Sequence, residues 1–181
     1  MRLIGIDPGT QTLGWGVIDV KGRKLTLVAC GAHSAPKRAR SVAERLAAIA
    51  DLLAETIREH RPDVAAVERA FFGKNASAAL RVGEARGVAL AELARAGVRV
   101  EELTPAEVKK ALTGSGAARK PQVQMMVGAV LGRGEPIEPL DASDAVAIAI
   151  CLAHRLGPDG ARLPSGRSLR PKKARAKRAT S

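Results

Sequence analysis

Residues 1–20 read MRLIGIDPGTQTLGWGVIDV, and this stretch decides the fold. Its apolar residues at 3–6 form a short β pattern that ends on Asp7, and the Pro-Gly pair that follows breaks the strand. An apolar, extended pattern resumes over 13–20. We therefore expect a carboxylate at the end of a buried strand, where the turn leaves open space around it.

The rest of the chain alternates between strand and helix patterns. The turn sequence KGRK at 21–24 predicts a hairpin into a third strand, 25–32, so the first three strands should form an antiparallel meander. Beyond them, helical periodicity, capping motifs and short apolar runs predict further elements. These are a helix at 42–61, a strand at 64–68, a helix at 76–95, a strand at 98–103, and helices at 105–113, 120–131 and 142–156.

This order of elements predicts an α/β fold. We expect a mixed five-stranded sheet with three leading antiparallel strands and with helices on both faces. The strands at 3–7 and 64–68 should be parallel neighbours at its centre. The ordered domain should span residues 1–156. Residues 157–181 are rich in Pro, Gly, Ser, Arg and Lys, and this composition predicts a basic, disordered tail.

Composition limits the classes of function. The chain carries 30 Lys and Arg against 18 Asp and Glu, a net charge of +12, which suits a polyanion such as nucleic acid. A moderately basic body with a soluble tail would give the same charge. Cys30 and Cys151 lack metal-ligand spacing and should be free thiols. We find no signal peptide and no apolar run long enough to span a membrane, so we expect a cytoplasmic protein.

Four acids lie where the predicted fold can bring them together. Glu68 ends the strand at 64–68 beside Asp7, and Asp141 and Asp144 share one face of the last helix. Four carboxylates at one site need a countercharge, and Mg²⁺ or Mn²⁺ prefers such oxygen ligands. Two such ions can clamp a phosphodiester. Each acid alone also has a structural explanation, for example Asp141 as a helix N-cap.

Four motifs, in order, resemble the RuvC family of Holliday-junction resolvases: GIDPGTQTLGWGVI, VERAFFGKNASAALRVGEARGV, TPAEVKKALTGSGAARKPQV and DASDAVAIAI. The resemblance covers residues 1–155. It implies an RNase H-like fold and a homodimer that uses two Mg²⁺ ions per subunit, with Mn²⁺ as a substitute. It further implies paired, symmetric cleavage of a four-way DNA junction in recombination and repair, and a partnership with the RuvA–RuvB branch-migration complex.

The resemblance also implies roles for ten residues. The metal-binding catalytic acids would be Asp7, Glu68, Asp141 and Asp144. Lys109 and Lys120 would lie near the scissile phosphate, to stabilise the transition state or to neutralise the DNA backbone. A loop would contact the junction: Phe71 and Phe72 by stacking on unpaired bases, Lys74 and Asn75 by reaching phosphates or base edges. The two phenylalanines also fit a simpler role, as apolar contacts at the entry to the next helix.

Two questions stay open at the level of the sequence. The helix at 76–95 carries small residues at Gly83, Ala85, Gly87 and Ala91, which makes it a candidate dimer contact.

Another nuclease of the RNase H-like group with a different substrate, or a non-catalytic junction-binding module, would share most of the sequence features described above. GIDPGT also resembles the phosphate-binding turn of the actin and Hsp70 ATPases, but the sequence disfavours that class, because it needs a second copy of the domain and the chain shows no repeat.

Overall fold

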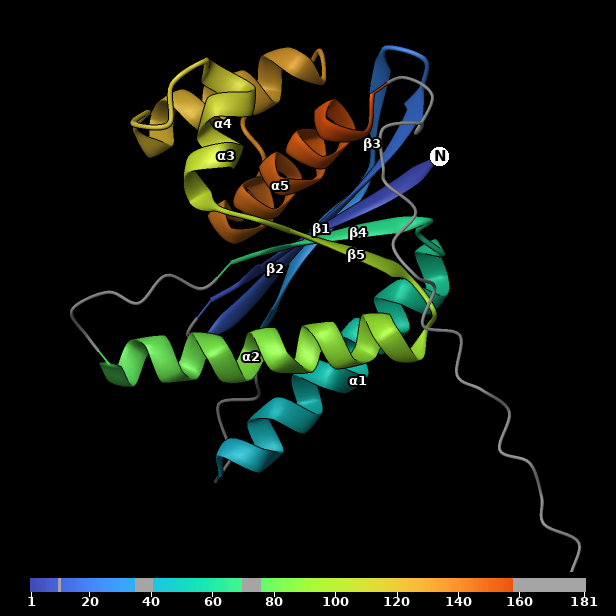
Figure 1. Ribbon diagram of the computed structural model, residues 1–181, viewed down its shortest axis with the longest axis vertical. Helices are drawn as coiled ribbons and strands as arrows, with labels where there is room; N and C mark the ends of the chain where they lie inside the picture. The colour runs from blue at the N-terminus through green and yellow to red at the C-terminus, as the bar shows by residue number, and fades with distance from the viewer. Residues whose placement is uncertain (10, 35–40, 70–75, 158–181) are drawn as a thin grey trace, which may run out of the picture.

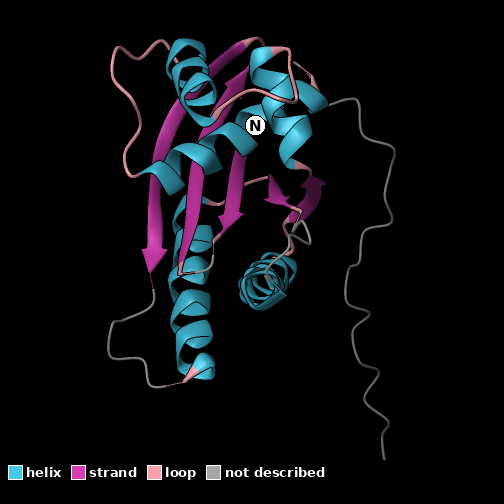
Figure 2. Cartoon of the chain, turned by 90° about the vertical axis from the view of Figure 1, so that its left-hand side faces the viewer, coloured by secondary structure: helices cyan, strands magenta, loops and turns pink. Residues whose placement is uncertain are grey.

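The computed structural model describes residues 1–9, 11–34, 41–69 and 76–157, which form one mixed sheet between two layers of helices (Figures 1 and 2). The strand order is β3-β2-β1-β4-β5. Strands β1 to β3 pair antiparallel, whereas β4 runs parallel to both β1 and β5. The five strands are β1 (Arg2–Pro8), β2 (Thr12–Lys21), β3 (Lys24–Ser34), β4 (Val64–Glu68) and β5 (Arg99–Leu103). The predicted fold class is confirmed.

Helices cover both faces of the sheet, as Figure 1 shows. Helices α1 (Val42–His60) and α2 (Ala76–Arg95) lie on one face. On the other face α5 (Leu140–Leu156) contacts the sheet directly, and α3 (Pro105–Thr113) and α4 (Lys120–Val130) pack against α5. None of the helices formed by the described residues is long and apolar enough to cross a membrane.

Local sequence signals explain where α1 and α3 begin. The Ser41 hydroxyl accepts a hydrogen bond from the Glu44 N–H at the start of α1. Thr104 and Glu107 form a complete capping box at the start of α3. The start of α5 differs from our prediction, because the helix begins at Leu140 after Pro139. Asp141 therefore lies inside the first helical turn and is not the N-cap residue.

The two faces of the sheet have separate apolar cores. Side chains alternate along each strand, so Leu3 joins the core beneath α5, whereas Ile4 and Ile6 join the core beneath α1 and α2. Helix α5 is buried almost all round because the sheet lies on one side of it and α3 and α4 on the other. This explains why its sequence, AVAIAICLA over 145–153, shows no polar stripe.

Glycines allow α5 to pack directly on the backbone of the sheet. A Cβ atom added to Gly5 would lie 2.1 Å from the Ala145 carbonyl oxygen, and one added to Gly14 would lie 2.1 Å from that of Asp141. Such distances are far shorter than any van der Waals contact, so no other residue fits at either position without moving the helix. Two glycines therefore fix the depth at which α5 sits.

Several predicted features fall outside the described residues. They are Phe71, Phe72, Lys74 and Asn75, and the tail from residue 158 onward. Cys30 and Cys151 are both free thiols, 121 residues apart in sequence, and Cys151 is a buried residue of α5.

Candidate active site

The ends of the two central strands bring Asp7 and Glu68 together. Ile6 pairs with Val67 in the parallel β1–β4 ladder, so both acids come one residue later on neighbouring strands. Alternation along the strands turns both side chains toward α5, since Leu3 on β1 and Ala66 on β4 belong to the core on that face. Both acids are half-buried.

Helix α5 adds the other two acids. Its first turn lies on Gly14, the β2 residue directly opposite Asp7, with the Asp141 backbone in contact. Asp144 follows three residues later and so points from the same side of the helix. Both side chains are half-buried. The contact between Gly14 and the Asp141 backbone therefore places the start of α5 next to the end of β1.

The pKa values of the two strand-end acids respond to burial and to the neighbouring carboxylates. Burial, followed in order of effect by the negative charges of Glu68, Asp144 and Asp141, raises the pKa of Asp7 to about 7. Burial also raises the pKa of Glu68, and Asp144 adds to this shift. The site thus carries more negative charge than its surroundings compensate.

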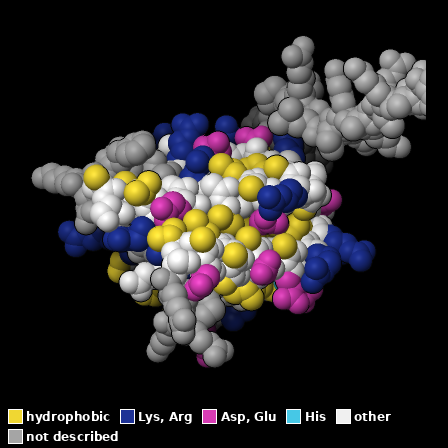
Figure 3. Space-filling model, turned by 90° about the horizontal axis from the view of Figure 1, so that it is seen from below, with side chains coloured by type: hydrophobic (Ala, Val, Ile, Leu, Met, Phe, Trp, Pro, Cys, Tyr) yellow, Lys and Arg dark blue, Asp and Glu magenta, His cyan; other side chains and the backbone are white. Residues whose placement is uncertain are grey.

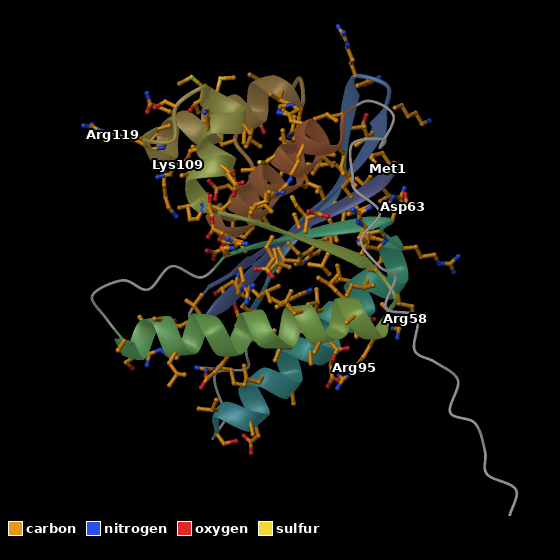
Figure 4. The ribbon with its side chains drawn as sticks, viewed as in Figure 1. Met1, Arg58, Asp63, Arg95, Lys109 and Arg119 are labelled. Carbon is orange, nitrogen blue, oxygen red and sulfur yellow. The ribbon has the colours of Figure 1, made fainter. Side chains whose placement is uncertain are left out.

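Two lysines partly offset that charge. The Lys120 ammonium donates a hydrogen bond to Asp144, with 2.8 Å between Nζ and Oδ2. Its positive charge lowers the pKa of Asp7 and of Glu68. Lys109, which Figure 4 labels on α3, also lowers the pKa of Glu68. The structure therefore places both predicted lysines within electrostatic reach of the acids.

The donor set fits a hard divalent cation. All four acidic side chains offer oxygen ligands, and burial together with mutual repulsion favours a cation among them. Within residues 1–9, 11–34, 41–69 and 76–157, no three His, Cys, Asp or Glu side chains already stand in an arrangement that would hold a metal ion. The acids therefore suit a divalent cation by the type of ligand atom and by their negative charge, whereas their side chains are not arranged as a preformed metal site.

An ion-pair network that we did not predict holds the chain as it leaves β4. The Arg69 N–H donates to the Leu103 carbonyl at 2.8 Å, and its guanidinium lies 3.6 Å from the carboxylate of Glu102. Arg86 on α2 binds the same carboxylate. This network anchors the residue next to Glu68. Nothing in the local sequence pattern marks it, because its members come from three elements.

The glycines beneath α5 are the other site-building residues that we did not predict. Gly5, Gly14 and Gly16 leave one face of β1 and β2 without side chains where the helix packs. Their signal in the sequence was the alternate-residue spacing of Gly5 with Asp7 and of Gly14 with Gly16, which puts all of them on the acid-bearing face.

Comparison with known proteins gives consistent matches over most of the chain. A family model described as crossover junction endodeoxyribonuclease RuvC matches residues 3–152. The enzyme of that description from Azorhizobium caulinodans is 46% identical over 158 residues, which cover 87% of this chain and 92% of the relative. The Thermus thermophilus RuvC structure matches with a TM-score of 0.78 at 36% identity, covering 86% of this chain and 95% of that one. The T. thermophilus protein in complex with Holliday junction substrate matches with a TM-score of 0.77 at 38% identity, covering 83% and 92%.

Proposed function

The chain belongs to the RuvC family of crossover junction endodeoxyribonucleases, and we propose that Asp7, Glu68, Asp141 and Asp144 form its catalytic centre. The protein is an endonuclease that resolves Holliday junctions by hydrolysing phosphodiester bonds. One observation carries the proposal for the site: Asp7 and Glu68 end neighbouring strands in register, and the start of α5 packs on Gly14, the residue opposite Asp7.

The family is one of metal-dependent nucleases, and the four acids would hold two Mg²⁺ ions per subunit, with Mn²⁺ as a substitute. Bound metal would supply a water activated for attack and charge stabilisation for the leaving 3′ oxygen. The acids themselves bind and orient this centre from the rigid ends of β1, β4 and α5. Because the α5 acids follow the close contact at Gly14, their position relative to Asp7 is set by backbone packing.

Cationic and aromatic residues would hold the DNA. Lys120 contacts Asp144 and Lys109 acts electrostatically on Glu68, so either ammonium group would bind the scissile phosphate and stabilise its growing negative charge. Phe71 and Phe72 would stack on unpaired bases at the crossover, and Lys74 and Asn75 would reach phosphates or base edges. These four residues come shortly after Glu68 in the sequence, separated from it by Arg69 and Ala70, which puts them near the site along the chain.

A symmetric homodimer would present one site to each of two opposed strands, since a four-way junction has approximate two-fold symmetry. The outer side of α2 supports this role. Leu80 is 66% exposed there, and Cβ atoms added to Gly83 and Gly87 would meet nothing within 4 Å. Figure 3 views the molecule from below relative to Figure 1, on the side where α1 and α2 lie. Hydrophobic side chains gather on this face. Ala85, which we had placed with these residues, is instead buried within the subunit.

We propose further that residues 1–156 are the nuclease domain, working in the cytoplasm with the RuvA–RuvB branch-migration complex. The basic tail at 157–181 would add salt-sensitive affinity for DNA of any sequence.

The test is cleavage of a four-way junction, a linear duplex and an RNA–DNA hybrid, each with Mg²⁺. We expect the junction to be cut, and Asp7→Asn to slow cutting by about 10²–10³-fold or more while junction binding persists. Asp51→Asn, at an exposed acid on α1, is the matched control and should cut normally. Equal cutting of the linear substrates would indicate a different nuclease. Undiminished cutting by Asp7→Asn would overturn the assignment of the site.

A further inference from the structure

Lys120 occupies an unusual place for a DNA-binding lysine. It is the first residue of α4, and its ammonium lies 2.8 Å from an oxygen of Asp144, which we assign to the metal-binding acids. The charges of Asp7 and Asp141 also act on it and help to raise its pKa, after the larger effect of the bond to Asp144. The ammonium therefore lies in direct contact with one member of the acid cluster.

The two partners differ in how free they are to move. The Asp144 side chain is 24% exposed and projects from a helix packed between the sheet and two other helices. The Lys120 side chain is 74% exposed, and its ammonium group ends a flexible four-carbon chain. Lys120 can therefore swing into solvent without disturbing the fold, whereas Asp144 must stay where α5 holds it.

From this asymmetry we propose that Lys120 is a placeholder cation, which neutralises Asp144 in the metal-free enzyme and must leave before that carboxylate can bind a metal ion. The inference rests on the proposed function, because it takes Asp144 to be a metal ligand. It adds a competition between an internal ammonium and the metal for the same oxygen atoms.

The competition would couple metal binding to DNA binding. An ammonium released from Asp144 has lost its anion, and a phosphate of bound DNA at the same site offers it another. DNA that attracts Lys120 therefore frees Asp144 for metal, and by linkage the metal frees Lys120 for DNA. Premature metal loading would be disfavoured in the absence of substrate.

Calorimetric titration of the DNA-free protein with Mn²⁺ tests the competition without any cleavage reaction. We expect Lys120→Met to bind Mn²⁺ about 3–10-fold more tightly than the wild type, because a competing cation has been removed. Lys110→Met is the control for net charge, since Lys110 is an exposed lysine on α3 with no assigned role. It should leave Mn²⁺ affinity unchanged.

A double-mutant cycle separates competition at Asp144 from simple repulsion between Lys120 and the metal. Repulsion would persist in an Asp144→Asn background, so adding Lys120→Met there would still tighten Mn²⁺ binding. Competition predicts that the gain disappears in that background. A gain of equal size in both backgrounds, or no gain in either, would overturn the placeholder role.

The same titrations distinguish this failure from failure of the site assignment. If Asp144→Asn alone leaves Mn²⁺ affinity as in the wild type, Asp144 is not a ligand and the proposed function loses that residue. If Asp144→Asn weakens Mn²⁺ binding but Lys120→Met does not strengthen it, only the placeholder role is wrong.

Discussion

The two faces of the sheet pack against their helices in different ways. Beneath α1 and α2, branched side chains such as Ile4, Val17 and Leu53 separate the helices from the strands. Beneath α5, glycines let the helix backbone touch the sheet backbone. The first arrangement leaves room for side chains to adjust. The second allows almost none, and it is the one that carries the acids.

This difference shows what close packing contributes to chemistry. A helix on a layer of side chains can shift by a few tenths of an ångström when one side chain changes. A helix that packs on glycines is positioned by backbone atoms. The positions of Asp141 and Asp144 relative to Asp7 are therefore fixed by backbone contacts.

The largest effect should come from filling the close contact. Gly5→Ala adds a Cβ only 2.1 Å from the Ala145 carbonyl oxygen and 2.6 Å from the Ala149 nitrogen. Both are backbone atoms that cannot turn away, so we expect a loss of unfolding free energy above about 3 kcal/mol, measured by urea denaturation. Ile4→Val, one residue earlier and on the opposite face, should cost only about 0.5–1.5 kcal/mol.

Similar losses of unfolding free energy for Gly5→Ala and Ile4→Val would show that both faces of the sheet tolerate change equally. That result would contradict the proposed difference in packing between the two faces. Gly134→Ala serves as the control for the added methyl group. Its Cβ would meet nothing within 4 Å, and unfolding free energy should hardly change.

The second effect concerns charge on the glycine face. The pKa of Asp7 is about 7 in the folded protein against 3.8 for an unperturbed carboxyl. Between these values the folded carboxyl keeps a proton that the unfolded one has lost, so stability falls as pH rises from about 4 to 7 and stays lower above it. Asp7→Asn should therefore raise the unfolding free energy at pH 8 by about 1–4 kcal/mol in metal-free buffer.

Thermal denaturation at pH 4.5 and pH 8 checks this sign, with Asp51→Asn as the exposed control. Adding Mg²⁺ at pH 8 should stabilise the wild type and narrow its gap from Asp7→Asn. A variant less stable than the wild type at pH 8 would mean that neither burial nor repulsion destabilises the charged form of Asp7.

The third effect concerns the outer side of α2. Gly87→Leu should weaken the proposed homodimer at least about tenfold, about 1.4 kcal/mol, because a large side chain would enter the proposed contact. It should leave the subunit folded, since the position is open and glycine is a poor helix former. Sedimentation velocity over a range of concentrations measures the dimer. An unaltered dimer would place the contact elsewhere, and Gly134→Leu supplies a comparison on an open loop.

The smallest effect should come from helix caps on the two faces. Thr104→Ala removes one side of the capping box of α3, which carries Lys109, and Ser41→Ala removes the N-cap hydrogen bond of α1. Each should cost about 1 kcal/mol of unfolding free energy. Only Thr104→Ala should also reduce junction cleavage at fixed Mg²⁺, because α3 lies on the side of the acids. Equal losses of cleavage in both variants would argue for a general effect of stability.

Much of this architecture could be predicted from the chain alone. Periodicity and turn residues gave the strands and helices, and α2 and β4 have the predicted bounds, since Pro62, Gly97 and the apolar run at 64–68 mark them clearly. Our predicted start of α5 was two residues too late. The helix begins at Leu140, and Pro139 occupies the N-cap position without a side-chain hydrogen bond. A capping argument based on Asp141 could not anticipate this.

Features that depend on three-dimensional packing were harder to predict. The glycine contacts of α5 involve residues more than 120 positions apart, and the link between Arg69, Glu102 and Arg86 joins three separate elements. The ion pair of Lys120 with Asp144 also depends on how α4 packs beside α5. Such pairs leave no local pattern, so a single sequence shows the groups but not their partners.

The most direct test of the account is a crystal structure grown with Mn²⁺, in which anomalous scattering locates the metal. We expect peaks contacting Asp7 together with acids of α5, and Lys120 turned away from Asp144. Metal bound at a place that touches neither Asp7 nor the start of α5 would contradict the account.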